Sequence, residues 1–263
     1  MTNSNYTKIS SITIARDEEK NILRCIKSLE GAVDEIIVLI DSRTTDKTSA
    51  LLSNSGSVTH KIVEWAGFSE TKKQALAMTS NDWVFWIDAD EELTPELREE
   101  IIKLKNDNIS GFASYSIPRR ANFLGRWIYN SGWYPGRVTR IFNKTAVDIS
   151  SNSVHEHLMT SGASGQLVSD LNHYTDPNID HYFRKFNNYT SLASAELIAK
   201  NKKFRITDII IRPIFMFIKM YILKQGFLDG LQGFILAVYS SLYVFTKYAK
   251  LWEQHFMKEN HDT

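Results

Sequence analysis

The sequence predicts an α/β fold with a mostly parallel sheet flanked by helices, because short apolar runs alternate with helix-like patterns along its first part. Two runs, residues 35–40 (EIIVLI, apolar from Ile36 onward) and 83–87 (WVFWI), are typical of strands buried on both faces of a sheet. Before the first run, Ile22, Leu23, Ile26 and Leu29 lie at helical spacing, as in a helix that packs on one side. The pattern therefore indicates consecutive βαβ units.

The elements can be placed in order along the chain. The first strand is expected at residues 9–15 and the first helix over 18–29. Ser69 is expected to cap a helix that runs to Met78. Residues 94–96 (Thr-Pro-Glu) supply an N-cap, a proline at the first helical position and an early acid, which together mark a helix start. Further strands are expected at residues 35–40, 58–63 and 83–87.

The residue pattern changes twice in the second half of the chain. Short β-like runs at 112–117 and 138–142 lie among glycine, arginine and aromatic residues, which favours a substrate-shaping region. Residues 208–224 and 227–248 are strongly apolar and aromatic, but neither stretch has eighteen uninterrupted apolar residues, so a spanning helix is not expected. Amphipathic helices in a membrane interface and ordinary core helices remain two open interpretations.

Composition limits the class of protein. Apolar residues make up 43% and charged residues 23% of 263 residues, which is typical of a folded globular chain. Lys plus Arg (31) nearly balances Asp plus Glu (30), so no nucleic-acid partner is expected. Cys25 is the only cysteine, which excludes an internal disulfide, and it shares the apolar face of its helix, so we expect it in the core. The polar N-terminal stretch lacks an apolar signal region, so a cytoplasmic location or a place at the cytoplasmic membrane face is expected.

Two acids follow directly on the strand at 83–87. Asp88 and Asp90 would stand at the carboxyl end of a buried strand, where ligands bind in parallel sheets. Carboxylates at this spacing can approach one Mg²⁺ or Mn²⁺ ion, which commonly bridges to substrate phosphates. Glu91 and Glu92 are expected to be solvated acids that lead into the next helix.

A third acid, Asp41, ends the strand at 35–40. An acid in that place can hydrogen-bond a nucleobase or a ribose. Asp46, five residues on, is expected to cap the following helix. Either Lys72 or Lys73 could reach the nucleotide, and the residues alone do not decide between them.

Several segments in the same order resemble glycosyltransferase family 2. The nucleotide-binding half of that family is matched by SITIARDEEKNILRCIKSLEGAVDEIIVLIDSRTTDKT and WAGFSETKKQALAMTSNDWVFWIDADEEL. Later segments that resemble it are PRRANFLGRW, GWYPGRVTRIF, SVHEHL and the apolar C-terminal stretch that begins at RPIF. The resemblance covers nearly the whole chain and is greatest to bacterial lipopolysaccharide core β-glycosyltransferases of the glucosyltransferase type.

The resemblance implies a GT-A fold, an inverting mechanism, a divalent metal and a nucleotide-diphosphate sugar donor, with a UDP-sugar expected. By position, Asp41 resembles the acid that contacts the nucleobase, and Asp88 and Asp90 resemble the D-x-D pair, with Asp90 as the direct metal ligand. Glu156 stands where the catalytic base is expected, with a salt bridge to a nearby arginine as the alternative. His173 stands where some members provide a further metal or diphosphate contact, although a core role stays open.

Further residues complete the expected site. On the acceptor side, aromatic faces can stack on sugars and arginine can bind phosphate groups. Gly136 replaces an aspartate that is common in the family, so the resemblance does not identify the acceptor. The expected donor-side residues are Lys72, Arg16 and Glu18, and the expected acceptor-side residues are Asn122, Arg126, Trp133 and Arg140.

The predicted domains are a GT-A domain over 1–205 and a helical, membrane-associating extension over 206–263. Within the first, the donor-binding half covers about 8–110 and the acceptor-side half about 111–205. The predicted function is transfer of a hexose such as glucose to a lipopolysaccharide inner-core or related lipid-linked glycan, by a protein in peripheral contact with the inner membrane face. The oligomeric state stays open, a homo-oligomer included.

Other functions remain as alternatives. The acceptor could be a polyprenyl phosphate or a capsular or exopolysaccharide glycan. A non-catalytic membrane-binding protein of the same fold is the alternative from another class. Nucleotidyltransferases are disfavoured, because residues 15–18 (Ala-Arg-Asp-Glu) stand where those enzymes carry a glycine-rich phosphate loop.

Overall fold

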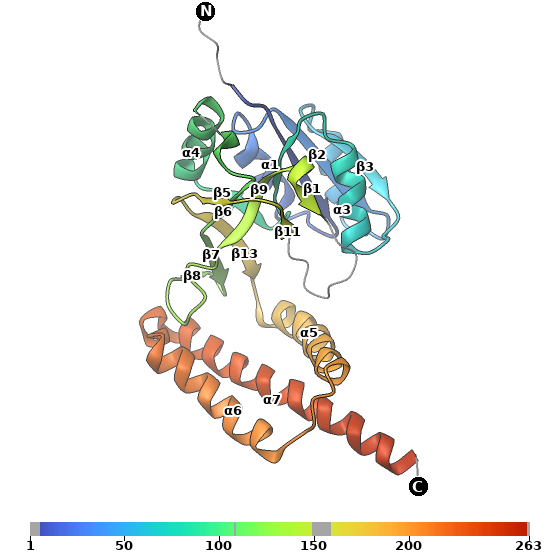
Figure 1. The fold of residues 1–263 in the computed structure, drawn as a ribbon, viewed down its shortest axis with the longest axis vertical. Coiled ribbons are helices and arrows are strands. Elements are labelled where there is room, and N and C mark those ends of the chain that lie inside the picture. The colour runs from blue at the N-terminus through green and yellow to red at the C-terminus, as the bar shows by residue number, and fades with distance from the viewer. Residues whose placement is uncertain (1–5, 108, 149–158, 262–263) are drawn as a thin grey trace, which may run out of the picture. The chain divides into compact units, whose positions relative to one another are not determined.

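The computed structural model describes residues 6–107, 109–148 and 159–261 and gathers the chain into two compact units (Figure 1). The first unit takes its residues from Met1–Arg119 and Gly136–His173, and the second from Arg120–Pro135 and Tyr174–Thr263. The chain passes from one unit to the other within two strands and once more between Pro135 and Gly136. Each unit is described separately below.

The first unit is built on a sheet whose strand order is β12-β6-β9-β4-β1-β2-β3 among the described residues. Strands β1 to β4 run parallel to one another, whereas β9 is antiparallel to both β4 and β6. The strand bounds are β1 (Ile9–Ala15), β2 (Glu35–Asp41), β3 (Thr59–Val63), β4 (Trp83–Trp86), β6 (Ser114–Ile117), β9 (Val138–Asn143) and β12 (Ser164–Gln166). The mostly parallel α/β sheet that the sequence predicts is confirmed, and β9 makes it mixed.

Helices cover both faces of this sheet, because successive residues of its strands point to opposite sides. Val38 and Ile40 join the core cluster that contains Ile22 and Leu97 of two helices, while Ile37 joins the cluster on the other face. Cys25 is fully buried in the first of these clusters, which confirms its core position. The helices are α1 (Ile22–Leu29), α2 (Thr48–Ser53), α3 (Phe68–Ala77) and α4 (Pro95–Asn106).

Smaller elements complete the first unit. Strand β5 (Glu91–Leu93) pairs antiparallel with the first half of β13 (Leu171–Asp176). Strands β10 (Val147–Asp148) and β11 (Met159–Thr160) pair with each other. Short 3₁₀ turns lie at Ile109–Gly111 and Lys144–Ala146.

Most expected boundaries in this unit are confirmed and two are wrong. The helix expected from residue 18 begins at Ile22, because Asp17 has a positive φ of 54° and the chain turns before it becomes helical. Ser69 does not cap α3, whose N-cap is Gly67 at φ 91°. The start of α4 is confirmed, since the Thr94 side chain accepts a hydrogen bond from the backbone N–H of Leu97.

The second unit is mainly helical. The strand β7 (Arg119–Phe123) forms a hairpin with β8 (Arg126–Ile128). Phe123 and Ile128 of this hairpin are fully buried in a cluster with Leu236 from the last helix. The helices are α5 (Ile179–Ala199), α6 (Ile206–Ile218), a π-helical turn (Lys219–Leu223), a 3₁₀ turn (Gly226–Asp229) and α7 (Gly230–His261).

One buried acid joins the turn before α7 to the loop after β8. The Asp229 side chain is 2% exposed and accepts hydrogen bonds from the backbone N–H groups of Tyr129 and Asn130 at 3.1 and 3.0 Å. The amide of Asn130 and the hydroxyl of Ser131 donate to the same carboxylate. The four bonds hold residues 129–131 against the turn.

The helices α6 and α7 each present an exposed apolar stripe. In α6 the stripe repeats every four residues, and in α7 it recurs at intervals of three, four or seven residues, which is the spacing of one helix face. The helix within Gly226–Met257 is also long and apolar enough to cross a membrane, with a mean hydropathy of 1.3 and 28% of its apolar window buried. The stripe residues are Ile206, Ile210, Ile214 and Ile218 in α6, and Leu231, Phe234, Val238, Leu242, Phe245, Trp252 and Phe256 in α7.

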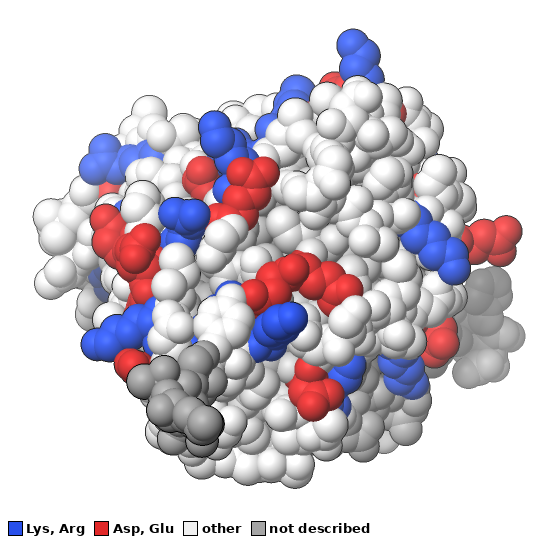
Figure 2. All heavy atoms as spheres, turned by 90° about the horizontal axis from the view of Figure 1, so that it is seen from above, with Lys and Arg blue, Asp and Glu red and all other residues white. Residues whose placement is uncertain are grey.

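Charges of both signs are interspersed on the face drawn in Figure 2. No broad field of one sign covers that face. This agrees with the near balance of 31 basic and 30 acidic side chains in the chain.

Gly233 in α7 is a position where close packing allows no side chain. A Cβ there would overlap the carbonyl oxygen of Gly226 and lie 2.8 Å from the Cβ of Asp229. We predict that Gly233→Ala lowers the free energy of unfolding by at least about 2 kcal/mol, as overpacking does elsewhere. Gly56→Ala is the matched control, because a Cβ at Gly56 meets nothing within 4 Å. Equal urea denaturation midpoints for the two variants would contradict the prediction.

Candidate active site

The carboxyl ends of β1, β2 and β4 lie along one edge of the sheet, because these strands are parallel neighbours. Arg16 follows β1, Asp41 ends β2, and Asp88 follows β4 with one residue between. The fold thus brings residues from three separate sequence segments to the same edge, which is the place expected for a ligand site in such a sheet.

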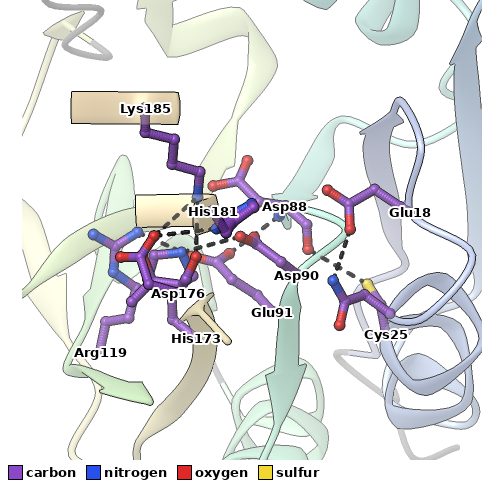
Figure 3. A network of polar contacts seen from close by, with 12 residues as sticks. Glu18, Cys25, Asp88, Asp90, Glu91, Arg119, His173, Asp176, His181 and Lys185 are labelled. Atoms are coloured by element: carbon purple, nitrogen blue, oxygen red, sulfur yellow. Dashed lines mark hydrogen bonds and ion pairs between the residues drawn. The ribbon is translucent and has the colours of Figure 1, made fainter. Parts of the chain in front are cut away.

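Asp88 is paired with an arginine from the antiparallel neighbour of β4. Arg140 lies in the middle of β9, and its Nη2 contacts Asp88 Oδ2 and lies 2.5 Å from Glu91 Oε1. Partial burial opposes ionisation of Asp88, but the charge of Arg140 outweighs it and holds the pKa of Asp88 below its ordinary value. Figure 3 shows Asp88 and Glu91 within one network of polar contacts.

Glu91 is fully buried, so the expectation of a solvated acid is wrong. Its Oε2 accepts a hydrogen bond from the backbone N–H of Asp88 at 3.1 Å, and its Oε1 lies 3.2 Å from Arg119 Nη1. Burial raises the pKa of Glu91 above its ordinary value. The available signal was the alternation in β5, where Leu93, two residues on, is buried on the same face and Glu92 between them is not.

Asp90 pairs with a histidine from β13. Its Oδ2 lies 3.3 Å from His173 Nε2, and the two side chains are only 19% and 17% exposed (Figure 3). The antiparallel register places His173 opposite Glu91, which explains how a residue over eighty positions away reaches the acids. The structure thus places Asp90 next to His173, whereas the carboxylate of Asp88, two residues away, is paired with Arg140.

The donor set at this place fits a divalent cation. A carboxylate oxygen and an imidazole nitrogen lie side by side, and the half-exposed Asp88 is two residues from Asp90. Mg²⁺ commonly uses one or two protein carboxylates and fills its remaining positions with water and substrate phosphate. Within the described residues no group of three or more His, Cys, Asp or Glu side chains is arranged to hold a metal ion. Asp90 and His173 are therefore two groups that could serve as ligands of such a cation.

Asp41 is buried at the end of β2 and accepts hydrogen bonds from Arg43, a residue that the sequence did not single out. Arg43 donates to it from Nη2 at 2.6 Å and from Nε at 3.0 Å, and Arg16 Nη1 lies 4.0 Å away. The hydrogen bonds from Arg43 lower the pKa of Asp41. The Arg43 guanidinium also lies 5.6 Å from the centre of the Trp65 ring.

The other two donor-side residues also lie in the first unit. Lys72 in α3 places its Nζ 3.6 Å from the centre of the Trp86 ring, at the end of β4. Its positive charge also contributes to the lowered pKa of Asp88. The Glu18 carboxylate accepts a hydrogen bond from the side-chain amide of Asn21 at 2.8 Å.

The expected acceptor-side residues are divided between the units. Asn122 in β7, Arg126 in β8 and Trp133 lie in the second unit, whereas Arg140 lies in the first with the acids. The rings of Trp133 and Phe123 pack edge to face, with their centres 6.0 Å apart. Arg126 is exposed and donates to a backbone carbonyl at 3.3 Å. Glu156, the expected catalytic base, lies outside the described residues.

Comparisons with known proteins agree with this geometry. The family described as glycosyl transferase family 2 matches residues 10–167. The lipopolysaccharide core biosynthesis glycosyltransferase LpsC of Rhizobium meliloti is 30% identical over 95% of this chain and 94% of its own. An uncharacterized glycosyltransferase of Rickettsia typhi is 28% identical over 96% of this chain and 89% of its own.

Solved structures are more distant. The crystal structure of S. aureus TarS 1-349 in complex with UDP-GlcNAc is 14% identical, with a TM-score of 0.49 over 91% of this chain and 82% of that one. The match of residues 10–167 and the near full-length relatives decide the family. The chain is a glycosyltransferase and belongs to glycosyltransferase family 2.

Proposed function

We propose that this glycosyltransferase is metal-dependent and inverting, and that it moves a hexose such as glucose from a UDP-sugar to a lipopolysaccharide inner-core or related lipid-linked glycan. The observation that supports it best is the contact between Asp90 and His173, two residues from Asp88, at the carboxyl edge of the sheet. Two acids and an imidazole gathered at a ligand edge are suited to hold a cation beside a diphosphate. The name of the Rhizobium relative supports the choice of acceptor.

Asp90 and His173 would hold the metal, and Asp88 is the third candidate ligand. A bound Mg²⁺ or Mn²⁺ ion supplies positive charge that stabilises the diphosphate as the glycosidic bond breaks. Lys72 is proposed to contact the diphosphate, because its positive charge is close enough to contribute to the lowered pKa of Asp88. The chain thus offers acids for the cation and a lysine for the leaving group.

Asp41 is proposed to hydrogen-bond the nucleobase or ribose. Its carboxylate is kept ionised and oriented by Arg43, and Arg16 stands next to it. An oriented, ionised carboxylate is an acceptor for a base N–H or a ribose hydroxyl, as in other nucleotide-binding sheets. Glu18, in the turn after β1, belongs to the same proposed donor side.

Glu156 is proposed as the catalytic base on its position in the sequence motif SVHEHL. Inversion requires a base that takes the proton of the acceptor hydroxyl while that oxygen attacks the anomeric carbon. On the acceptor side, Asn122, Arg126 and Trp133 are proposed to contact the glycan. Arg140 is better placed to act through the acids than on the acceptor.

Membrane contact is proposed for the apolar stripes of α6 and α7. The two acids between residues 206 and 252, Asp208 and Asp229, are both buried. Arg212, Lys219 and Lys224, by contrast, are exposed beside the stripes. An apolar face edged by positive charge suits the anionic cytoplasmic leaflet. This arrangement supports a proposed location at the inner membrane face.

The first prediction concerns the donor. Purified protein is expected to hydrolyse one nucleotide sugar in a panel of UDP-, GDP-, ADP- and CMP-sugars, with Mg²⁺ or Mn²⁺ and not with chelator, because the leaving diphosphate needs the cation. Asp90→Asn should abolish this turnover, whereas Asp107→Asn, an exposed acid at the end of α4, should not. Absence of both turnover and calorimetric donor binding would support the non-catalytic alternative.

A second prediction concerns the base. Glu156→Gln should abolish sugar transfer to lipopolysaccharide with a truncated core, because the amide cannot take the proton of the attacking hydroxyl. Donor binding, measured by calorimetry, should remain as in the unaltered protein. Normal transfer by the variant would exclude Glu156 as the base.

A third prediction concerns the membrane. Reversing Lys219 and Lys224 to glutamate should weaken binding to phosphatidylglycerol-containing vesicles by about tenfold or more, since each basic residue near the surface contributes about 1 kcal/mol. Flotation with increasing lipid measures the effect. The control reverses Lys20 and Lys61, two exposed lysines of the first unit. Equal loss in both double variants would exclude specific contact through α6 and α7.

A further inference from the structure

One nitrogen of Arg140 is shared by two carboxylates that differ in their freedom to move. Arg140 Nη2 contacts both Asp88 Oδ2 and Glu91 Oε1. The Glu91 side chain is 0% exposed, whereas the Asp88 side chain is 46% exposed. Asp88 therefore lies on the solvent side of the guanidinium and Glu91 on the inner side.

Glu91 is fixed from several directions. Arg119 contacts its Oε1 at 3.2 Å, and its Oε2 accepts the backbone N–H of Asp88 at 3.1 Å. Its strand is paired with β13, opposite His173. In the part of the chain that the structure describes, the hydrogen bond to the Asp88 carboxylate comes from Arg140. Glu91 is thus held by more described contacts than the carboxylate of Asp88.

The buried guanidinium limits what Asp88 can do. Arg140 is only 9% exposed, and its Nε is buried without a hydrogen-bond partner among the described residues. Removing one member of a buried ion pair leaves an uncompensated charge, which is strongly unfavourable. If Asp88 turned away, Arg140 would be left in that condition unless a second acid stayed with it.

We propose that Asp88 exchanges Arg140 for a divalent cation, and that Glu91 is the positioning residue that keeps Arg140 neutralised during the exchange. The inference rests on the proposed metal dependence. Asp90 and His173, the other proposed ligands, lie two residues along the chain and opposite Glu91 in the sheet register.

The test is Mn²⁺ binding, measured on purified protein by electron paramagnetic resonance of the free ion. Glu91→Gln leaves Asp88 as the sole acid partner of Arg140, so Asp88 is held more tightly and the Kd for Mn²⁺ should rise about tenfold or more, as for other outer-sphere changes. In Glu91→Gln/Arg140→Gln, Asp88 is released and the Kd should fall back toward that of the unaltered protein.

Glu92→Gln is the matched control. It removes the same charge from the adjacent residue, whose side chain accepts a hydrogen bond from Asn172 and is not among the contacts of Arg140. The Kd of this variant should change by less than about twofold, because the Glu92 carboxylate is bound to Asn172 and its loss leaves both acid partners of Arg140 in place. An unchanged Kd in Glu91→Gln, or an equal rise in Glu92→Gln, would overturn the proposal.

A measurement on the unaltered protein keeps the test valid if Glu91→Gln does not fold. The Arg140 guanidinium signal in ¹⁵N-arginine NMR, assigned by its loss in Arg140→Lys, should shift as Mg²⁺ saturates the protein. A saturated protein with an unmoved signal would exclude the exchange. If the unaltered protein binds neither Mn²⁺ nor Mg²⁺, with or without UDP, the proposed metal dependence itself fails. Binding by the unaltered protein with no effect of Glu91→Gln removes only the exchange.

Discussion

The buried charge of Arg140 constrains the arrangement of the acids at the end of β4. A guanidinium inside a protein needs anionic partners, and two carboxylates from the next strand and loop supply them. In return, the arginine lets Asp88 and Glu91 stand three residues apart without repelling each other. Glu91 also fixes the backbone at Asp88, because its carboxylate accepts a hydrogen bond from the backbone N–H of Asp88.

The strand pairing extends this constraint along the chain. β5 contributes only three residues, yet its pairing with β13 brings His173 to Asp90. β9 returns antiparallel to β4 and carries Arg140 inward from the opposite direction. Local sequence at residues 88–91 provides the acids, but their partners come from segments some fifty and eighty residues further on. The site is therefore a product of sheet topology as much as of the motif.

Much of the first unit could be predicted from sequence because its signals are local. Apolar runs located β1, β2 and β4 almost to the residue, and the Thr-Pro-Glu start of α4 was recognisable from capping chemistry alone. The strand-end positions of Asp41 and Asp88 followed from the same reasoning. Glycine conformation was harder to foresee, since Gly67 rather than Ser69 caps α3.

The partners of the acids could not be predicted, because each depends on long-range pairing. Nothing near Glu91 in the sequence indicates that two arginines from β7 and β9 will surround it. Arg43 illustrates the local version of the problem, since a bidentate grip on Asp41 depends on the shape of the loop and not on residue type. The role of Glu156 remains a prediction from its position in the motif.

The four hydrogen bonds at Asp229 carry a consequence for how such proteins diversify. The loop at residues 129–131 and the turn that begins α7 share one carboxylate, although a hundred residues separate them. A sequence change in either segment that removes these hydrogen bonds would leave the buried carboxylate of Asp229 without its partners. Chimeras that exchange C-terminal helices between relatives should therefore carry residues 126–135 along as part of the same module, and recombination breakpoints that separate the two should be rare among functional hybrids.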